Sequence, residues 1–326
     1  MSAKPVTLRF RKWAWPVRDE GRFFQLLFQD VTGRPVVIID DDSGQVDIEL
    51  ESVYGDRMIP NYKSRLHRFV HSHLPGGIKF DGGEHTPNQQ PSGSGRFRIF
   101  FTGENERPPE GRWDAYLTFD MHAYGGRNAY LPLWWITSSD ILVPTVSPYL
   151  GREIRLDNML LPRTPDYDSR KKFCVAFIGK AYPFRMHSLT ALSQVGEIDV
   201  FGGIARNTKK TSASEKYEIS QEYRFVYSFE NDLFPGYVTE KAPEAWATGA
   251  VPLYWGSDPK GFLNPKSMIN CADYPTLEAF IEKVKEVNSS KLLWESYASE
   301  PFLLKKPDLT EVKLLLSNVL RPLIQK

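Results

Sequence analysis

The sequence has few cysteines, no long apolar run and almost no net charge. Its two cysteines, Cys174 and Cys271, each lie in a short apolar stretch, and no Cys-x-x-Cys spacing occurs. Cysteines in such surroundings are typically small buried side chains and not ligands or nucleophiles. No apolar run approaches the roughly 18 residues of a membrane-spanning helix, and no signal peptide is recognisable. We therefore predict a protein of the cytoplasm without an integral membrane segment.

The overall charge excludes whole-surface attraction to polyanions. Lys and Arg total 41 against 40 Asp and Glu, which leaves a net charge of +1. No global field then favours nucleic acid, so any anion site must be local. At 326 residues the chain exceeds what one core serves, which predicts two domains with a cleft between them. The eight Trp would suit stacking on sugar or base rings as well as packing.

Short apolar runs alternate with helical patterns along most of the chain. In the first half, strands are expected at residues 6–10, 36–39, 46–50, 97–101 and 115–119, helices at 21–29 and 63–71, and a loop at 76–95. In the second half, strands are expected at 173–178, 198–201, 225–229, 251–255 and 267–270, and helices at 185–194, 240–247, 277–287, 291–299 and 310–325. This rhythm predicts an α/β fold in two units, residues 1–160 and 161–326, joined by a proline-rich connection.

A lysine is expected at the start of the helix that follows the strand at residues 225–229. Pro243 is tolerated only in a first helical turn, so this helix must begin near Thr239 or Glu240. Lys241 then meets the positive end of the helix dipole, which disfavours it by a few tenths to about 1 kcal/mol unless an anion is nearby. A bound diphosphate would supply that anion. Glu240 is equally well explained as an acid that complements the dipole.

Other candidate residues lie at expected strand ends, where open α/β folds bind ligands. Arg185 opens the helix after residues 173–178, although a surface arginine without a role is the alternative. Glu104 and Glu106 follow the strand at 97–101 and are catalytic candidates, with two solvated loop acids as the alternative. Gly202 and Gly203 would allow a ligand to approach the backbone closely.

Several longer segments of the sequence match motifs of a known family and occur in the same order as in that family. They are Phe229-Glu230-Asn231, Tyr237-Val238-Thr239-Glu240-Lys241 and Pro252-Leu253-Tyr254-Trp255-Gly256, with Phe101-Thr102-Gly103-Glu104-Asn105-Glu106, Phe119-Asp120 and Pro132-Leu133-Trp134-Trp135 ahead of them. Together they resemble the α-1,3/4-fucosyltransferase family, which consists of inverting enzymes that use GDP-fucose. The resemblance spans most of the chain, but the first 95 residues align only in rhythm.

The resemblance implies a GT-B architecture, in which two Rossmann-like domains face each other across a cleft. Residues 1–160 would bind the acceptor, and residues 161–326 would bind GDP-fucose and carry the C-terminal helices. The diphosphate would be neutralised by Arg185 and Lys241 and the rest of the donor contacted by Asn231, Tyr237 and Glu240. The general base would be Glu104 or Glu106, with Glu104 preferred because bacterial members favour it.

The implied reaction moves L-fucose from GDP-β-L-fucose to a hydroxyl of a Gal-GlcNAc-type oligosaccharide acceptor. Alternatives are another GDP-deoxyhexose as donor, or a carbohydrate-binding relative without turnover. No Asp-x-Asp pair stands at a suitable strand end, so no metal is expected to be required, while stimulation by a divalent ion stays open. Residues 180–185 and 231–236 differ from the sequence that is common in the family. We therefore expect these loops to alter how the donor or the acceptor binds. Many bacterial members end in heptad repeats and a basic amphipathic tail, whereas this sequence ends soon after the expected helix at 310–325, which argues against membrane attachment. A cytoplasmic location is therefore expected, with peripheral attachment at the inner membrane as the alternative.

Overall fold

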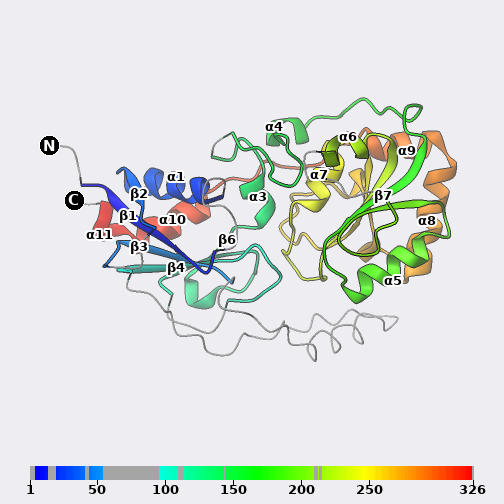
Figure 1. The fold of residues 1–326 in the computed structure, drawn as a ribbon. Helices are drawn as coiled ribbons and strands as arrows, with labels where there is room; N and C mark the ends of the chain where they lie inside the picture. The colour runs from blue at the N-terminus through cyan, green and yellow to red at the C-terminus, as the bar shows by residue number, and fades with distance from the viewer. Residues whose placement is uncertain are drawn as a thin grey trace.

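Two parallel β-sheets lie side by side along the long axis of the molecule (Figure 1). This computed structural model describes residues 4–13, 20–40, 44–53, 95–108, 113–142, 144–208, 212 and 215–324. The expected helix at 63–71 lies outside these residues, as does all but the last residue of the expected loop at 76–95. Within the described residues, the two parallel sheets with their helices confirm the predicted α/β class.

The first sheet has six parallel strands in the order β2-β1-β3-β4-β5-β6. They are β1 (Val6–Arg11), β2 (Val36–Ile38), β3 (Ile48–Glu51), β4 (Phe97–Phe101), β5 (Ala115–Thr118) and β6 (Asn128–Tyr130). Helix α1 (Glu20–Thr32) covers one face of this sheet through Phe24, Leu27 and Phe28, which are fully buried. The apolar side chains of β3 and β4 belong to the same core, and this burial accounts for the apolar runs from which these strands were predicted.

The second sheet has five parallel strands in the order β11-β10-β9-β7-β8. They are β7 (Lys172–Ile178), β8 (Ile198–Gly202), β9 (Tyr223–Phe229), β10 (Val251–Trp255) and β11 (Ile269–Asn270). Its helices are α5 (Pro183–Leu192), α6 (Lys216–Ser220), α7 (Lys241–Ala247), α8 (Leu277–Ser289) and α9 (Lys291–Ala298). Side chains of α5 and α8 share one core with the sheet, while α6 and α7 pack on its other face. Central strands covered on both faces are apolar almost throughout.

Two short helices, α3 (Leu133–Thr137) and α4 (Leu156–Met159), lie between the last strand of the first sheet and the first strand of the second. The 3₁₀ turns are η1 (Tyr124–Gly126), between β5 and β6, and η3 (Pro265–Ser267) and η4 (Cys271–Asp273), on either side of β11. All five side chains of α3 are buried, including Trp134 and Trp135. Both rings lie edge-on to Phe262 of the second half, so α3 forms part of the packing between the sheets.

The last two helices return to the first sheet. Helices α10 (Thr310–Val319) and α11 (Arg321–Ile324) lie beside α1 (Figure 1). Val312, Leu316 and Leu323 are buried in the core of the first sheet, and Arg34 donates a hydrogen bond to the Leu323 carbonyl at 3.0 Å. The sequence grouped these helices with the second unit, whereas their packing is with the first. The expected domain boundary near residue 160 stays a prediction.

Candidate active site

The strand ends of the second sheet bring several predicted residues to one edge. Because all five strands are parallel, the segments that follow β7, β9 and β10 leave the sheet on the same side. Helix α5 with Arg185 follows β7, and Glu230 and Asn231 follow β9 directly. The loop at residues 231–236 then leads to Tyr237 and to the start of α7.

Glu230 forms the buried centre of this edge. Its side chain is 0% exposed, and it accepts hydrogen bonds from the Thr239 amide at 2.8 Å, the Thr239 hydroxyl at 2.7 Å and the Lys241 ammonium at 3.1 Å. Burial raises the pKa of Glu230, and Lys241 opposes that rise. Glu230 belongs to the Phe229-Glu230-Asn231 motif, but no role was predicted for it from the sequence. An acid directly after a buried apolar strand was the available signal, because such a charge needs a partner.

Lys241 is the first residue of α7, as Pro243 predicted. Its ammonium lies 3.1 Å from Glu230 Oε2, 2.7 Å from Thr239 Oγ1 and 3.7 Å from Glu240 Oε1. Burial alone would lower the pKa of Lys241, but the two carboxylates raise it, so the side chain stays charged. The protein itself thus supplies the anion expected at this helix end. The dipole argument therefore no longer requires a phosphate, although the side chain is still 19% exposed.

Arg185 lies in the first turn of α5 and is 4% exposed, which excludes the alternative of a surface arginine. Its Nη1 donates to Asn231 Oδ1 at 2.9 Å, and Asn231 Nδ2 approaches the Tyr237 hydroxyl at 3.4 Å. The Nε of Arg185 is buried without a hydrogen-bond partner in the described structure. The positive charge of Arg185 acts to lower the pKa of Lys241, against the larger effect of the two carboxylates.

Glu240 precedes α7, and its side chain is 13% exposed. Burial would raise the pKa of Glu240, but the charges of Lys241 and Lys216 outweigh it and lower the pKa. Glu240 is therefore a carboxylate at neutral pH. Tyr237 is 1% exposed, and burial together with Glu104, Glu230 and Glu240 raises its pKa, so its hydroxyl stays protonated.

The predicted catalytic acids lie on the opposite side, in the loop after β4. Glu104 and Glu106 are half-buried, and the Thr102 hydroxyl donates to the Glu104 carbonyl at 3.0 Å. Between the two acids, Asn105 Nδ2 donates to Asp232 Oδ2 at 3.1 Å, which joins this loop to the loop after β9. The charge of Glu104 also acts on Tyr237. The structure thus brings the loop that carries Glu104 and Glu106 on the first sheet to the loop after β9 of the second.

Gly202 and Gly203 close the end of β8, next to β7. A Cβ on Gly202, whose φ is +112°, would lie 2.3 Å from the Ile178 carbonyl oxygen, and the Gly203 amide donates to that oxygen at 3.0 Å. Packing of β8 against β7 therefore explains Gly202 without a ligand. A ligand contact at these two glycines stays a prediction.

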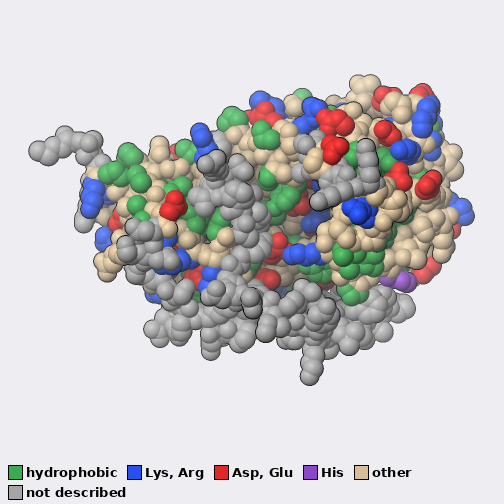
Figure 2. Space-filling model, viewed as in Figure 1, with side chains coloured by type: hydrophobic (Ala, Val, Ile, Leu, Met, Phe, Trp, Pro, Cys, Tyr) green, Lys and Arg blue, Asp and Glu red, His purple; other side chains and the backbone are tan. Residues whose placement is uncertain are grey.

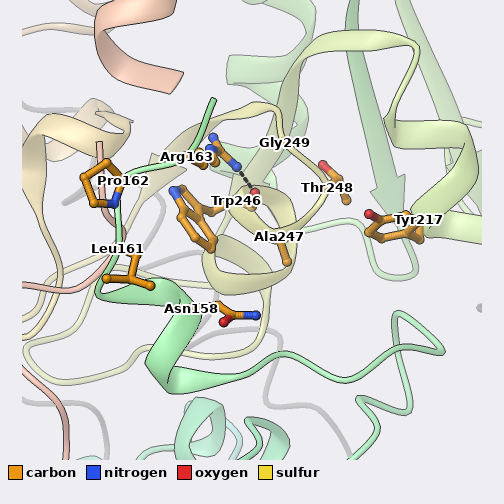
Figure 3. Close-up of a pocket in the computed structure, with 9 residues that line it drawn as sticks. All are labelled: Asn158, Leu161, Pro162, Arg163, Tyr217, Trp246, Ala247, Thr248 and Gly249. Carbon is orange, nitrogen blue, oxygen red and sulfur yellow. Dashed lines mark hydrogen bonds between the residues drawn. The ribbon is translucent and has the colours of Figure 1, made fainter. Parts of the chain in front are cut away.

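A cavity of about 400 Å³ lies at the opposite end of α7 (Figure 3). Its walls are Asn158, Leu161, Pro162, Arg163, Tyr217, Trp246, Ala247, Thr248 and Gly249, none of which is a predicted site residue. Arg163 lies over the Trp246 ring at 4.6 Å and donates to the Trp246 and Ala250 carbonyls. The cavity therefore lies apart from the predicted site. In the view of Figure 2, acidic and basic side chains lie close to one another near the middle of the molecule.

Metal-binding clusters and membrane-spanning helices are both absent from the part of the chain that the structure describes. No group of three or more His, Cys, Asp or Glu residues there could hold a metal ion. No helix among the same residues is both long and apolar enough to span a membrane. Cys174 and Cys271 are both buried and unpaired with each other.

Comparison with known proteins gives consistent matches. Residues 168–300 match the family model described as glycosyltransferase family 10 (fucosyltransferase), C-terminal part. The alpha-(1,3)-fucosyltransferase FucT of Helicobacter pylori is 28% identical over 215 residues, which is 60% of this chain and 45% of that protein. The 3-galactosyl-N-acetylglucosaminide 4-alpha-L-fucosyltransferase FUT3 of Pongo pygmaeus is 31% identical over 120 residues, 35% of this chain and 31% of that protein. The chain thus matches less than half the length of either relative.

The fold is also similar to solved structures. A crystal structure of an α1,3-fucosyltransferase with GDP-fucose superposes with a TM-score of 0.65 at 19% identity, covering 100% of this chain and 92% of that one. Another crystal structure of an α1,3-fucosyltransferase gives a TM-score of 0.66 at 19% identity, covering 100% of this chain and 91% of that one. At this identity the likeness shows the fold, and it confirms the expected GT-B-like arrangement of two α/β units.

Proposed function

Since the chain belongs to glycosyltransferase family 10, the fucosyltransferases, through residues 168–300, we propose that it transfers L-fucose from GDP-β-L-fucose to an acceptor hydroxyl with inversion. One arrangement carries this proposal. At one sheet edge Lys241 contacts the buried Glu230 and Arg185 contacts the neighbouring Asn231. The loop that carries Glu104 reaches the loop after β9 from the other sheet through the hydrogen bond of Asn105 to Asp232. Two cations opposite a carboxylate suit a reaction in which a diphosphate leaves and a hydroxyl loses a proton.

The donor diphosphate would bind between Arg185 and Lys241. The buried, unpaired Nε of Arg185 offers a donor that an anion could satisfy. Lys241 stays charged and remains partly exposed. Fixed positive groups stabilise the charge that develops on the leaving group, and one such donor is worth roughly 3–4 kcal/mol in known cases. Asn231, Tyr237 and Glu240 would orient the remaining parts of the donor, with Gly202 and Gly203 beside the nucleotide.

The general base would be Glu104, with Glu106 as the alternative. Its carboxylate would take the proton of the acceptor hydroxyl while that oxygen attacks the anomeric carbon. The bond from the anomeric carbon to the phosphate oxygen breaks at the same time, and GDP leaves from the opposite face. One displacement inverts the configuration. Glu104 is preferred because the resemblance to bacterial members of the family favours the first of the two acids.

The remaining features of the proposal concern partners and location. Residues 1–160 would bind a Gal-GlcNAc-type acceptor and residues 161–326 the donor. No metal would be required, because Arg185 and Lys241 already supply positive charge at the leaving group, and a divalent ion would at most stimulate. We place the enzyme in the cytoplasm, with peripheral attachment at the inner membrane as the alternative.

The test measures GDP release from GDP-fucose with and without a Gal-GlcNAc acceptor. We expect Glu104→Gln to lower kcat by roughly 10²–10⁴-fold, the range of general-base catalysis, and to leave the GDP dissociation constant nearly unchanged. Lys241→Ala should weaken GDP binding as well as turnover. The control is Lys285→Ala on α8, whose lysine is 65% exposed and which should behave as wild type.

Three outcomes would overturn parts of the proposal. Full turnover in Lys241→Ala would refute the donor-site assignment. A loss in Glu106→Gln that exceeds the loss in Glu104→Gln would move the base to Glu106. Turnover with another GDP-deoxyhexose in preference to GDP-fucose, measured by donor competition, would change the donor.

A further inference from the structure

The loop at residues 231–236 crosses from the second sheet to the first. Asp232 accepts the hydrogen bond of Asn105, and the Tyr130 hydroxyl donates to the Gly236 carbonyl at 3.1 Å. The Phe234 ring lies 5.8 Å from the Phe119 ring in an edge-on contact. The sequence of this loop differs from the one common in the family, and the loop contacts residues of the first sheet and its loops. A displacement of this loop would therefore change its contacts with the first sheet.

Arg107 is the counterpart of this loop on the first sheet. Its guanidinium carbon lies 3.4 Å from the centre of the Phe234 ring, and its Nη1 forms an ion pair with Asp120. Asp120 is 4% exposed and also accepts hydrogen bonds from the Tyr124 hydroxyl at 2.6 Å and the His122 amide at 3.0 Å. Burial would raise the pKa of Asp120, but these partners and Arg107 lower it, so it remains a carboxylate.

This geometry holds Arg107 at two points that belong to different sheets. Asp120, which follows β5 of the first sheet, forms the ion pair with the guanidinium. Phe234, which follows β9 of the second sheet, contacts the face of the guanidinium with its ring. A guanidinium is planar and can lay its face on an aromatic ring while it also forms an ion pair, whereas an ammonium has no planar face to stack. Glu106 immediately precedes Arg107 and Glu104 lies three residues before it, so the contacts of Arg107 are made at the end of the carboxylate loop.

We propose that Arg107 is a positioning residue that, through its contact with Phe234, aligns the carboxylate loop at residues 102–107 with the donor site. This inference rests on the proposed function, because it concerns the alignment of the proposed base. Arg107 itself touches neither donor nor acceptor in this proposal. When Phe234 and Arg107 separate, the carboxylate should move away from the acceptor hydroxyl while the donor site on the second sheet remains intact.

The experiment is a double-mutant cycle on the full-length enzyme with Arg107→Met, Phe234→Leu and the double variant. Each single change should lower kcat at saturating substrates by roughly 2–30-fold, in line with the strength of a cation–π contact. The double variant should be little worse than Arg107→Met alone, because the contact is already lost. The GDP dissociation constant should stay within about threefold of wild type.

Two further variants separate positioning from folding. Arg107→Lys keeps a charge for Asp120 but loses the planar contact, so its melting temperature should stay near wild type while kcat falls. Arg152→Met is the matched control, because Arg152 also pairs with an acid, Glu218, and lies 4.1 Å from the centre of an aromatic ring, that of Tyr217. It should leave kcat unchanged.

The outcomes distinguish this inference from the proposed function. Additive losses in the cycle, an unchanged kcat in Arg107→Lys, or GDP affinity that falls in step with kcat would each overturn the role of Arg107, provided that the wild type transfers fucose. A wild type that does not transfer fucose overturns the proposed function itself, and the alignment of a base falls with it.

Discussion

At the scale of single residues, the buried Glu230 determines how the second sheet presents its lysine. A carboxylate with 0% exposure is stable only when its oxygens are paired, and Thr239 and Lys241 provide three hydrogen bonds. These bonds hold the segment that leads into α7 and fix the Lys241 ammonium at the sheet edge. The lysine is thereby placed before any ligand arrives, which lowers the cost of organising the site on binding.

Gly236 is a second residue whose identity follows from the geometry. Its φ is +84°, and an added Cβ would lie 2.2 Å from the Phe119 carbonyl oxygen of the first sheet. We expect Gly236→Ala to lower the free energy of unfolding by more than the about 1–2 kcal/mol that a positive φ costs an alanine, because the two sheets must also move apart. Urea unfolding, followed by tryptophan fluorescence, measures the loss.

Gly33→Ala is the control for this change. Gly33 has a φ of +66° but no atom within 4 Å of an added Cβ, so only the backbone cost applies there. Equal losses in the two variants would show that the close approach of Gly236 to Phe119 contributes nothing to stability.

At this scale, the sequence predicted where residues lie in their helices better than it predicted which side chains they contact. Pro243 was enough to place Lys241 at the start of α7, because proline restricts where a helix can begin. It could not predict that Glu230 supplies the neighbouring anion, because that contact depends on how the loop at residues 231–236 folds back. Likewise, the helical pattern placed Arg185 correctly but left its burial open, since Asn231 reaches it only in three dimensions.

At the scale of elements, α7 is a seven-residue helix that is held at both ends by other segments. Helices this short are marginal in isolation, so tertiary contacts must stabilise it. Glu230 binds Lys241 at its start, while Arg163 and Arg170 donate to the carbonyls of Trp246 and Thr248 at its end. The two arginines come from the connection between the sheets, and this anchoring fixes the direction in which α7 presents its first turn.

Helix α10 makes a testable contribution to the first sheet. Leu316 is 0% exposed within the core beside α1, whereas Leu314 on the same helix is 64% exposed. We expect Leu316→Ala to lower the free energy of unfolding by about 2–5 kcal/mol, the range for a buried leucine. Leu314→Ala should change it by less than about 0.5 kcal/mol. Chemical denaturation of both variants checks this, and equal effects would contradict the packing of α10 on the first sheet.

Most elements could be predicted from local patterns, and the exceptions are short or depend on distant packing. The strands with long apolar runs, such as β4 and β9, were predicted to within two residues. Strand β6 was missed because its three residues carry no periodicity and acquire their pairing from β5. The association of α10 with the first sheet was missed for a related reason, because an apolar stripe indicates that a helix is buried but not against what.

At the scale of the whole molecule, the two sheets share packing. The core of the first sheet continues into Tyr237, Val238, Ala242 and Tyr254 of the second half. The number of units followed from chain length and rhythm, whereas this shared core could not, since it joins residues more than 100 positions apart. A displacement of side chains at the edge of one sheet can therefore be transmitted to the other sheet through this shared core.

This continuity predicts how GDP should affect the two halves, as hydrogen exchange can measure. GDP would bind the second sheet, so the amides of residues 231–241 should exchange more slowly in its presence. At 100 times its dissociation constant, a ligand stabilises the form that binds it by about 2.7 kcal/mol. If Arg107 and Phe234 join the two loops, part of this protection should extend to residues 102–107 of the first sheet.

The same measurement on Arg107→Met separates direct from transmitted protection. In that variant, GDP should still protect residues 231–241, because Arg185, Asn231 and Lys241 are unchanged. Protection of residues 102–107 should be lost, since the contact that carries it is gone. Helix α9, which lies on the far side of the second sheet from the first, serves as the internal reference. If wild-type protection stops at the second sheet, the sheets behave as independent units, and the alignment of the carboxylate loop must have another cause.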